Sequence, residues 1–269
     1  MPASALALAL ASALLHAAWN LLLARARDVQ AAAAATFLLS VALAAPFAAV
    51  WWSANPSVWP YALASSLLEA IYVVALAQAY KLTDLSFVYP LTRGLAPVLV
   101  LAAGALLLGH GASSHEVIGV VLVAAGVLLV RGRPERADLQ ALLAVATIAA
   151  TIAAYTLVDR AGIQKAGAIT YFVLVLAGPC LVYPPLVGLR PLRQALGKAT
   201  LLAAVANLGS FSLGLLALRK GAAAPVLAVR SSSIVIATLL AGRLLGEDVP
   251  RGRITGSAVV FAGVVLLAF

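Results

Sequence analysis

The stretch Arg93–Gly109, RGLAPVLVLAAGALLLG, returns 137 residues later as Arg230–Gly246, RSSSIVIATLLAGRLLG. The two stretches align without a gap, and each begins with an arginine and ends with a glycine. The same shift lays two glycines of the next apolar segment, Gly119 and Gly126, onto glycines. Apolar residues match often by chance, so the matched arginines and glycines are the informative part. This register predicts that the chain is a duplication.

The composition is that of a chain that crosses a membrane many times. Of the 269 residues, 64% are hydrophobic and 10% are charged, and the mean hydropathy is +1.07. One soluble core cannot hide so much apolar surface. A net charge of +9 would suggest nucleic acid as a partner of a soluble chain, but here the basic residues lie mostly in short links between apolar runs. We therefore expect the lipid bilayer as a partner, and no nucleic acid.

Ten apolar runs are long enough to span the hydrocarbon core, which takes about 17 to 25 residues. The first run has no basic region before it, so we expect a retained helix rather than a cleaved leader. None of the links is long enough for a soluble domain. The expected spans are 3–23, 31–51, 61–80, 86–108, 115–130, 139–158, 168–188, 199–218, 224–245 and 253–268.

Five spans fall in each copy, and an odd number makes the second copy enter the membrane from the opposite side. The sequence therefore predicts an all-α polytopic membrane protein with ten transmembrane helices. The helices form two inverted five-helix repeats, over residues 1–133 and 134–269. Inverted repeats are typical of secondary transporters, which bind substrate near the bilayer midplane between the two halves.

Arg93 and Arg230 both lie inside apolar runs. At a rise of 1.5 Å per residue, each is roughly 10 Å below the face at which its helix enters, and inversion makes these faces opposite. An arginine at the bilayer centre costs about 2.5 to 3.5 kcal/mol on insertion scales, so it should face the bundle interior and an anion. We expect the two arginines to bracket a central cavity.

Glu69 is the one acidic residue that these spans place deep in the membrane. Two guanidiniums and one carboxylate would form a net-positive site for an anionic or zwitterionic substrate. The alternative is structural, with Glu69 paired to one arginine and the other arginine bound to carbonyls that prolines have loosened. Acidic and basic residues at span ends are expected to be solvated. They are Lys81, Asp84, Asp159, Arg219 and Lys220.

Other polar and aromatic residues are candidates for the same cavity. His16 and Asn20 lie one helical turn apart with Trp19 beside them, and Tyr72 lies on the face of Glu69. Histidine titrates near neutral pH, so His16, with Glu69, is a candidate for proton coupling. Phe211 is a further interior candidate. The candidate substrate ligands are Arg93, Arg230, Glu69, Trp19, Tyr72, Asn20, Tyr89, Tyr155 and Asn207.

Other function classes lack their chemistry in this sequence. It contains no HExxH, no GxSxG and no pair of aspartates deep in the expected spans, so an enzyme is not expected. The single cysteine, Cys180, forms neither an intramolecular disulfide nor a zinc cluster, and we expect no cofactor and no metal. A channel would need charge rings or a filter loop, whereas arginines in an inverted repeat favour alternating access.

The stretches LLHAAWNLLLARARD (14–28) and GEDVPRGRITGSAVVFAGVVLL (246–267) resemble the EamA-type branch of the drug/metabolite transporter superfamily. The resemblance covers essentially the whole chain. Relatives of this kind include amino-acid exporters, choline permeases and, more distantly, phosphate-ester and nucleotide-sugar translocators. Basic residues on the matching helices of the phosphate-ester translocators hold the anionic group of the substrate, and the resemblance implies this role for Arg93 and Arg230.

We therefore expect a secondary transporter in the inner (plasma) membrane, acting as a monomer on a small-molecule substrate. The favoured substrate is an anionic or zwitterionic metabolite, above all an amino acid or an analogue, and the favoured direction is export. The alternative is a carrier of organic cations, such as choline or cationic drugs, that uses Glu69 and aromatic residues.

The link 131–138, with three arginines, reports the orientation of the chain. The positive-inside rule places it in the cytoplasm and both termini outside, whereas the family resemblance implies cytoplasmic termini. On the positive-inside rule, a cysteine placed in this link, in a Cys180→Ser background, should resist an impermeant maleimide added outside intact cells. Labelling from outside would reverse the topology and leave the inverted repeat intact.

Overall fold

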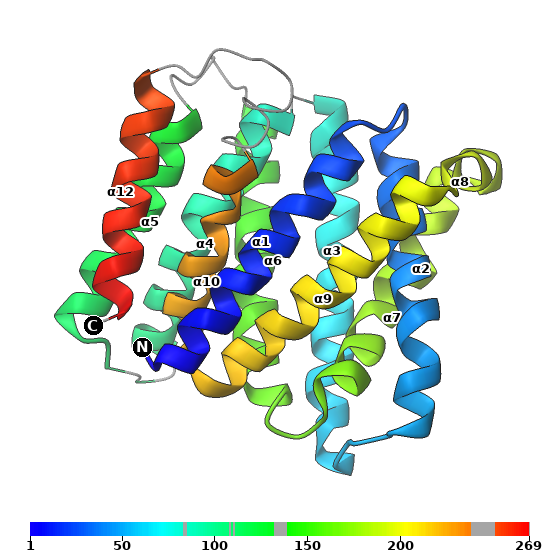
Figure 1. Cartoon of the computed structure of the whole chain (residues 1–269), viewed down its shortest axis with the longest axis horizontal. Coiled ribbons are helices and arrows are strands. Elements are labelled where there is room, and N and C mark those ends of the chain that lie inside the picture. The colour runs from blue at the N-terminus through cyan, green and yellow to red at the C-terminus, as the bar shows by residue number, and fades with distance from the viewer. Residues whose placement is uncertain (83–84, 108, 110, 132–138, 238–250, 269) are drawn as a thin grey trace.

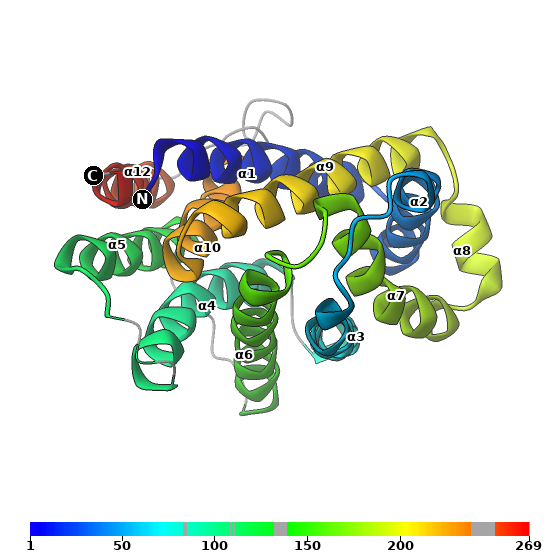
Figure 2. The same cartoon turned by 90° about the horizontal axis from the view of Figure 1, so that it is seen from below.

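The computed structural model describes residues 1–82, 85–107, 109, 111–131, 139–237 and 251–268 (Figure 1). In these residues the regular elements are helices, and the one β-bridge joins Ala54 to Ala166. The helices pack side by side as one bundle, which Figure 2 shows from below. The expected all-α class is therefore confirmed for the described residues.

The observed helices follow the expected spans closely. The ninth expected span ends among residues that are not described, and the short helices η1 (Pro56–Val58) and α8 (Leu189–Ala195) lie in links. The long elements are α1 (Ala3–Ala24), α2 (Val29–Val50), α3 (Trp59–Leu82), α4 (Leu85–Leu107), α5 (Ser114–Arg131), α6 (Leu139–Gly162), α7 (Ala168–Val187), α9 (Lys198–Lys220), α10 (Ala223–Ser231) and α12 (Arg251–Ala268).

Six of these helices are long and apolar enough to cross a membrane: α1, α2, α3, α6, α7 and α9. Four further apolar helical stretches are shorter, at 91–106, 114–129, 223–237 and 254–268. Large apolar side chains cover the outer faces, and Leu63, Leu67 and Phe261 are 65%, 62% and 71% exposed. Such outward-facing apolar residues fit contact with lipid, whose hydrocarbon accepts them at no cost.

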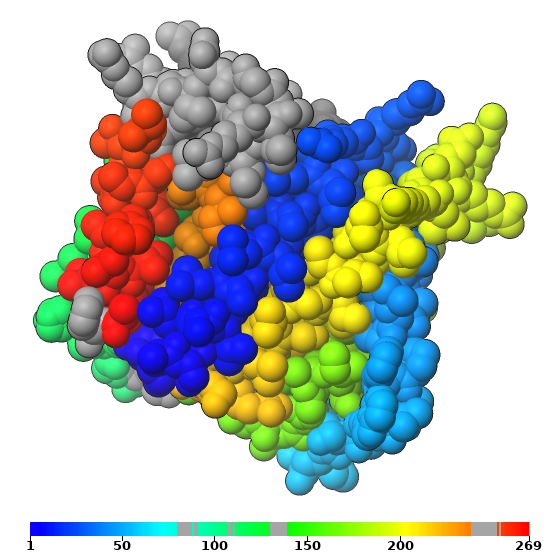
Figure 3. All heavy atoms as spheres, viewed as in Figure 1, coloured from blue at the N-terminus to red at the C-terminus, as the bar shows by residue number. Residues whose placement is uncertain are grey.

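The two halves of the chain are interleaved. Helix α1 packs along α9, as the two adjoining bands in Figure 3 show, and α3 packs along α6. Helix α2 packs against α7, and α5 against α12. Both chain termini lie at the same end of the bundle (Figure 1), where the Met1 ammonium donates to the Leu267 carbonyl oxygen at 3.1 Å.

Helices α5 and α12 approach each other through glycines. A Cβ at Gly119 would lie 3.2 Å from the carbonyl oxygen of Gly263, and a Cβ at Gly126 would lie 2.8 Å from that of Gly256. The early glycine of each helix thus meets the late glycine of the other, so the helices run antiparallel. Small residues allow such close backbone packing in membranes, where lipid competes equally for apolar side chains.

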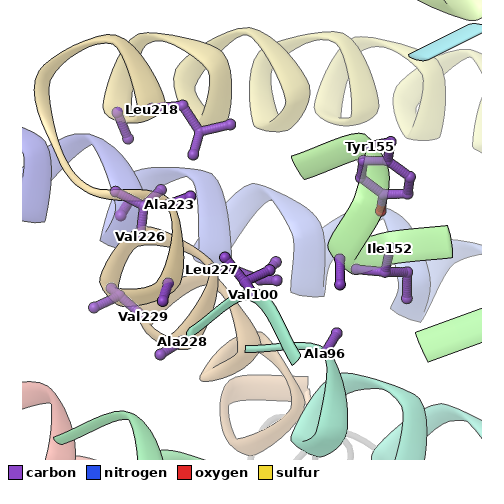
Figure 4. Close-up of a cluster of buried hydrophobic side chains, with 14 of the residues drawn as sticks. Ala96, Val100, Ile152, Tyr155, Leu218, Ala223, Val226, Leu227, Ala228 and Val229 are labelled. Carbon is purple, nitrogen blue, oxygen red and sulfur yellow. The ribbon is translucent and has the colours of Figure 1, made fainter. Parts of the chain in front are cut away.

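Helix α10 is the most enclosed element, because α1, α4, α5 and α9 surround it. Its residues 223–229 are buried and belong to a cluster of apolar side chains from α4, α6, α9 and α10 (Figure 4). The helix ends at Ser231, and helical structure resumes at residues 233–237 after a turn at Ser232. This break follows Arg230 directly and lies within the expected ninth span.

Gly126→Ala tests the α5–α12 contact. Its Cβ would lie 2.6 Å from the Val260 backbone nitrogen, so the helices must move apart, and we expect a loss of about 1–3 kcal/mol of stability. Gly104→Ala on α4 is the matched control, because nothing lies within 4 Å of its Cβ and alanine favours helix. Thermal unfolding in detergent should show a lower midpoint for Gly126→Ala alone, and equal midpoints would contradict the contact.

Candidate functional site

A cavity of about 50 Å³ lies inside the bundle. Its wall is formed by side chains of α1, α2, α3, α4, α6, α7, α9 and α10, so residues from both halves of the chain contribute. Apolar and aromatic side chains make up half of the wall. The full lining is His16, Trp19, Phe37, Glu69, Tyr72, Arg93, Tyr155, Thr156, Asp159, Leu176, Asn207, Ser210, Phe211, Leu215, Leu218 and Arg230.

Helix α1 contacts both arginines of the cavity. The Arg93 Nη2 lies 3.2 Å from the His16 Nε2, and the Arg230 Nε donates to the Ser12 Oγ at 3.0 Å. Ser12 and His16 are one helical turn apart, which corresponds to about 6 Å along the helix axis. The two guanidiniums therefore meet α1 at neighbouring levels and give one side of the cavity two fixed positive charges.

Arg230 reaches the cavity because residue 214 on α9 is a glycine. A Cβ at Gly214 would lie 2.7 Å from the Arg230 Cζ and 2.9 Å from its Nε. The Nε bonds to Ser12, and the terminal nitrogens of Arg230 donate no hydrogen bond to the described residues. These nitrogens are available to a ligand.

An aromatic wall continues from His16 along one side of the cavity. The Trp19 Nε1 lies 3.1 Å from the His16 Nδ1, and the two rings meet edge to face with centroids 5.3 Å apart. Trp19 also contacts Phe37, at a centroid distance of 6.4 Å. Asn20 does not line the cavity, since its amide donates back to the His16 carbonyl oxygen at 2.7 Å.

Glu69 faces the cavity from α3 and is 5% exposed. Its carboxylate accepts no hydrogen bond from the described residues and forms no ion pair within 4 Å with them. The close pair between Glu69 and an arginine, which the structural alternative required, is therefore not found in the described part of the chain. A carboxyl group buried in this way is stabilised by a hydrogen-bonding or charged partner.

Asp159 corrects one expectation from the sequence. It lies near the end of a span, as expected, but it is 2% exposed and therefore not solvated. Helix α6 continues to Gly162, beyond the expected end at residue 158, so Asp159 belongs to the last turn of the helix. The hydroxyls of Ser65 and Tyr171 donate to the Asp159 Oδ1 at 2.6 and 3.0 Å and replace water there. Asp159 lines the same cavity as Glu69, so two carboxyl groups face the two arginines there.

Arg219 also differs from expectation. Its guanidinium is half-buried and donates to the Ile163 carbonyl oxygen at 3.1 and 2.8 Å, and to that of Ala166. These carbonyls follow the end of α6, where a cation is favourable. Lys220 is exposed, as expected. The side chains of Lys81, Asp84 and Tyr89 lie outside the described residues.

The remaining candidates converge on the cavity. Tyr72 and Tyr155 meet edge to face with centroids 6.2 Å apart, and the Asn207 Nδ2 donates to the Ser40 Oγ at 3.1 Å. Phe211 lines the cavity as well. Sequence reasoning did not single out Ser12, Ser210, Phe37 or Gly214. For Ser12 a signal existed, because it lies one turn from His16 on the same face of α1.

A larger cavity, of about 720 Å³, opens near the end of the bundle that carries the termini. Residues of α4, α5, α6 and α10 line it, including Val100, Arg160 and Ala223. Among the described residues it shares no lining residue with the inner cavity. The buried cluster of Figure 4 contributes Leu218 and Tyr155 to the wall of the inner cavity and Val100 and Ala223 to that of the outer one.

Comparisons with known proteins agree with this architecture. Residues 3–132 match the model of the EamA-like transporter family. No curated protein matches the chain in sequence. A solved structure titled only as a crystal structure of a protein superposes with a TM-score of 0.78 at 18% identity, covering 99% of this chain and 96% of its own. At this identity it shows the fold alone. Over residues 3–132 the chain is therefore similar to the EamA-like transporter family.

Proposed function

We propose that this protein is a secondary transporter that moves a small zwitterionic metabolite, an amino acid or a close analogue, across the cytoplasmic membrane by alternating access. One observation carries the proposal. Two guanidiniums approach the cavity from one side, at α1, and the Glu69 carboxylate, which accepts no hydrogen bond from the described residues, lines the same cavity from α3. Export as the direction rests on the resemblance to amino-acid exporters.

The charges of the cavity favour a zwitterion over a simple anion. A substrate carboxylate would accept charge-assisted hydrogen bonds from Arg93 and Arg230, which present planar forks suited to two oxygens. A substrate ammonium would give Glu69 a charged partner within 4 Å, which the described residues do not supply. With Asp159 the cavity is lined by two carboxyl groups and two guanidiniums, so a net-neutral ligand with separated charges fits this lining better than an anion does.

We propose further that the chain consists of two inverted five-helix repeats. Exchanging the halves pairs α1 with α6, α2 with α7, α3 with α9, α4 with α10 and α5 with α12. The packing of α1 on α9 then corresponds to that of α6 on α3, and both contacts occur. The antiparallel glycine contacts of α5 and α12 also map onto each other under the exchange, as a twofold axis requires.

The size of the inner cavity supports alternating access. About 50 Å³ accommodates a few water molecules but not an amino acid, so the cavity must widen to bind one. The apolar cluster of Figure 4 packs against this cavity and contributes Leu218 and Tyr155 to its wall. The break at Ser232 gives α10 a natural point of movement, and broken helices are typical of transporter sites.

A carrier of organic cations is the second candidate. The observation that favours it is the Glu69 carboxylate beside the edge-to-face pair of Tyr72 and Tyr155, because aromatic rings and a carboxylate together bind quaternary amines. In that case Arg93 and Arg230 would be structural. The charge of the ligand that each variant loses distinguishes the two functions.

Arg93→Ala and Arg230→Ala should each weaken binding of an amino acid at least about thirtyfold. Losing one partner of a buried charge pair costs about 2–5 kcal/mol, and 1.4 kcal/mol is a factor of ten. Arg93→Lys should restore binding only in part, because a point charge cannot form the two-pronged contact. Glu69→Gln should weaken the binding of amino acids and amines and leave the binding of simple carboxylates unchanged.

Titration calorimetry on purified variants, with a panel of amino acids, carboxylates and quaternary amines, measures these effects. Arg25→Ala and Glu116→Gln remove charges outside the cavity and serve as matched controls. Normal binding of carboxylates by both arginine variants, together with loss of amine binding in Glu69→Gln, would establish the cation carrier instead.

Gly214→Ala tests whether Arg230 must lie where it does. The new Cβ would displace the flexible guanidinium rather than the backbone, so the fold should persist while amino-acid affinity falls about tenfold, at the low end of a charged hydrogen-bond loss. Gly209→Ala on the same helix, whose Cβ meets only the tip of Leu15, is the control. Equal affinities for the two variants would place Arg230 outside the binding site.

A further inference from the structure

We infer that Trp19 selects substrates through its indole N–H, which donates to an anionic oxygen of the substrate because His16 cannot serve as acceptor for both Trp19 and Arg93. The inference rests on the proposed function, since it names a specificity-determining residue of the same site. It assigns His16 the role of an acceptor that positions Arg93.

Both ring nitrogens of His16 face donors. The Trp19 Nε1 lies 3.1 Å from Nδ1, and the Arg93 Nη2 lies 3.2 Å from Nε2. An indole nitrogen and a guanidinium only donate. His16 is 8% exposed, so bulk water cannot supply the missing acceptor at either nitrogen.

The hydrogen-bond count of an imidazole makes the two contacts exclusive. Neutral imidazole has one acceptor nitrogen and one N–H, and imidazolium has no acceptor. In every one of these forms at least one of the two donors faces an N–H of His16 rather than a lone pair. His16 therefore offers one acceptor nitrogen at most to the two donors, Trp19 and Arg93.

The contact with Arg93 wins the competition for His16. A hydrogen bond from a charged donor is roughly twice as strong as one between neutral groups, so the Nε2 lone pair goes to Arg93 and the proton goes to Nδ1. The indole N–H then faces the Nδ1–H, and it has no other hydrogen bond in the described part of the chain.

The indole cannot turn away freely. Its ring packs edge to face on His16 and against Phe37, and Trp19 lines the cavity. A substrate carboxylate or phosphonate bound to the Arg93 guanidinium comes within reach of the indole N–H, since both groups contact one imidazole. An ammonium or a quaternary amine offers no lone pair and gains nothing there.

The tautomer of His16 can be measured without any substrate. The ¹⁵N spectrum of purified, histidine-labelled protein, assigned with His16→Gln, should show a neutral ring with its proton on Nδ1. A proton on Nε2 would leave Nδ1 as the acceptor, so Trp19 rather than Arg93 would bond to His16. A doubly protonated ring would offer an acceptor to neither donor. Either result overturns the inference, and neither bears on whether the protein transports amino acids.

Trp19→Phe removes the N–H and keeps an aromatic ring. With L-leucine as probe, affinity should fall roughly tenfold, whereas affinity for isopentylamine, which lacks the carboxylate, should change less than about twofold. Phe37→Leu, a neighbouring aromatic without a donor, should affect the two probes equally, and unfolding midpoints check the fold of each variant. If Trp19→Phe lowers the affinity for both probes equally, or for neither, the indole N–H does not contribute to substrate selection and Trp19 only packs against its neighbours. If wild type binds neither probe, the proposed function fails for this substrate class, and the ¹⁵N measurement still decides the state of His16.

Discussion

The two arginines inside the bundle are the constraint on which the rest of this structure depends. A guanidinium in hydrocarbon is stable only where polar groups replace its water, so each arginine must lie between helices that present such groups. Helix α1 does this for both, through Ser12 and His16. The cavity follows from that arrangement, because the helices around two planar cations cannot close against one another as apolar faces do.

Close packing of helices elsewhere in the bundle stabilises a fold that contains these buried polar groups. Glycines bring the backbones of α5 and α12 together, and Gly214 opens the place that the Arg230 guanidinium fills. Around α10, alanine, valine and leucine side chains form a buried apolar cluster that contributes residues to the walls of both the inner and the outer cavity. Glycine thus has two different effects. It brings the backbones of α5 and α12 into contact, and at residue 214 it leaves room for the Arg230 guanidinium.

The acidic side of the cavity shows how a bundle assigns roles that single helices cannot. Asp159 has its Oδ1 occupied by Ser65 and Tyr171, whereas Glu69 accepts no hydrogen bond from the described residues. Two carboxyl groups lining one cavity therefore differ in what they can offer a ligand. Asp159 is held by Ser65 and Tyr171, and we propose that Glu69 contacts the substrate. This difference supports the roles proposed above, in which Glu69 rather than Asp159 binds the ammonium group of the substrate.

The sequence by itself determined the helical class and the approximate ends of the described helices, because long apolar runs have few other solutions in a bilayer. It also singled out Arg93, Arg230 and Glu69, since a charge inside an apolar run is conspicuous. It misplaced Asp159, which lies where an apolar run gives way to a charged link and reads as a solvated end. Only the tertiary structure decided that Ser65 and Tyr171 would bury it, that Ser12 and His16 would contact the arginines, and that Gly214 would admit one of them. These are contacts between helices up to 218 residues apart, and the pattern within one helix does not specify which face of a distant helix it will meet.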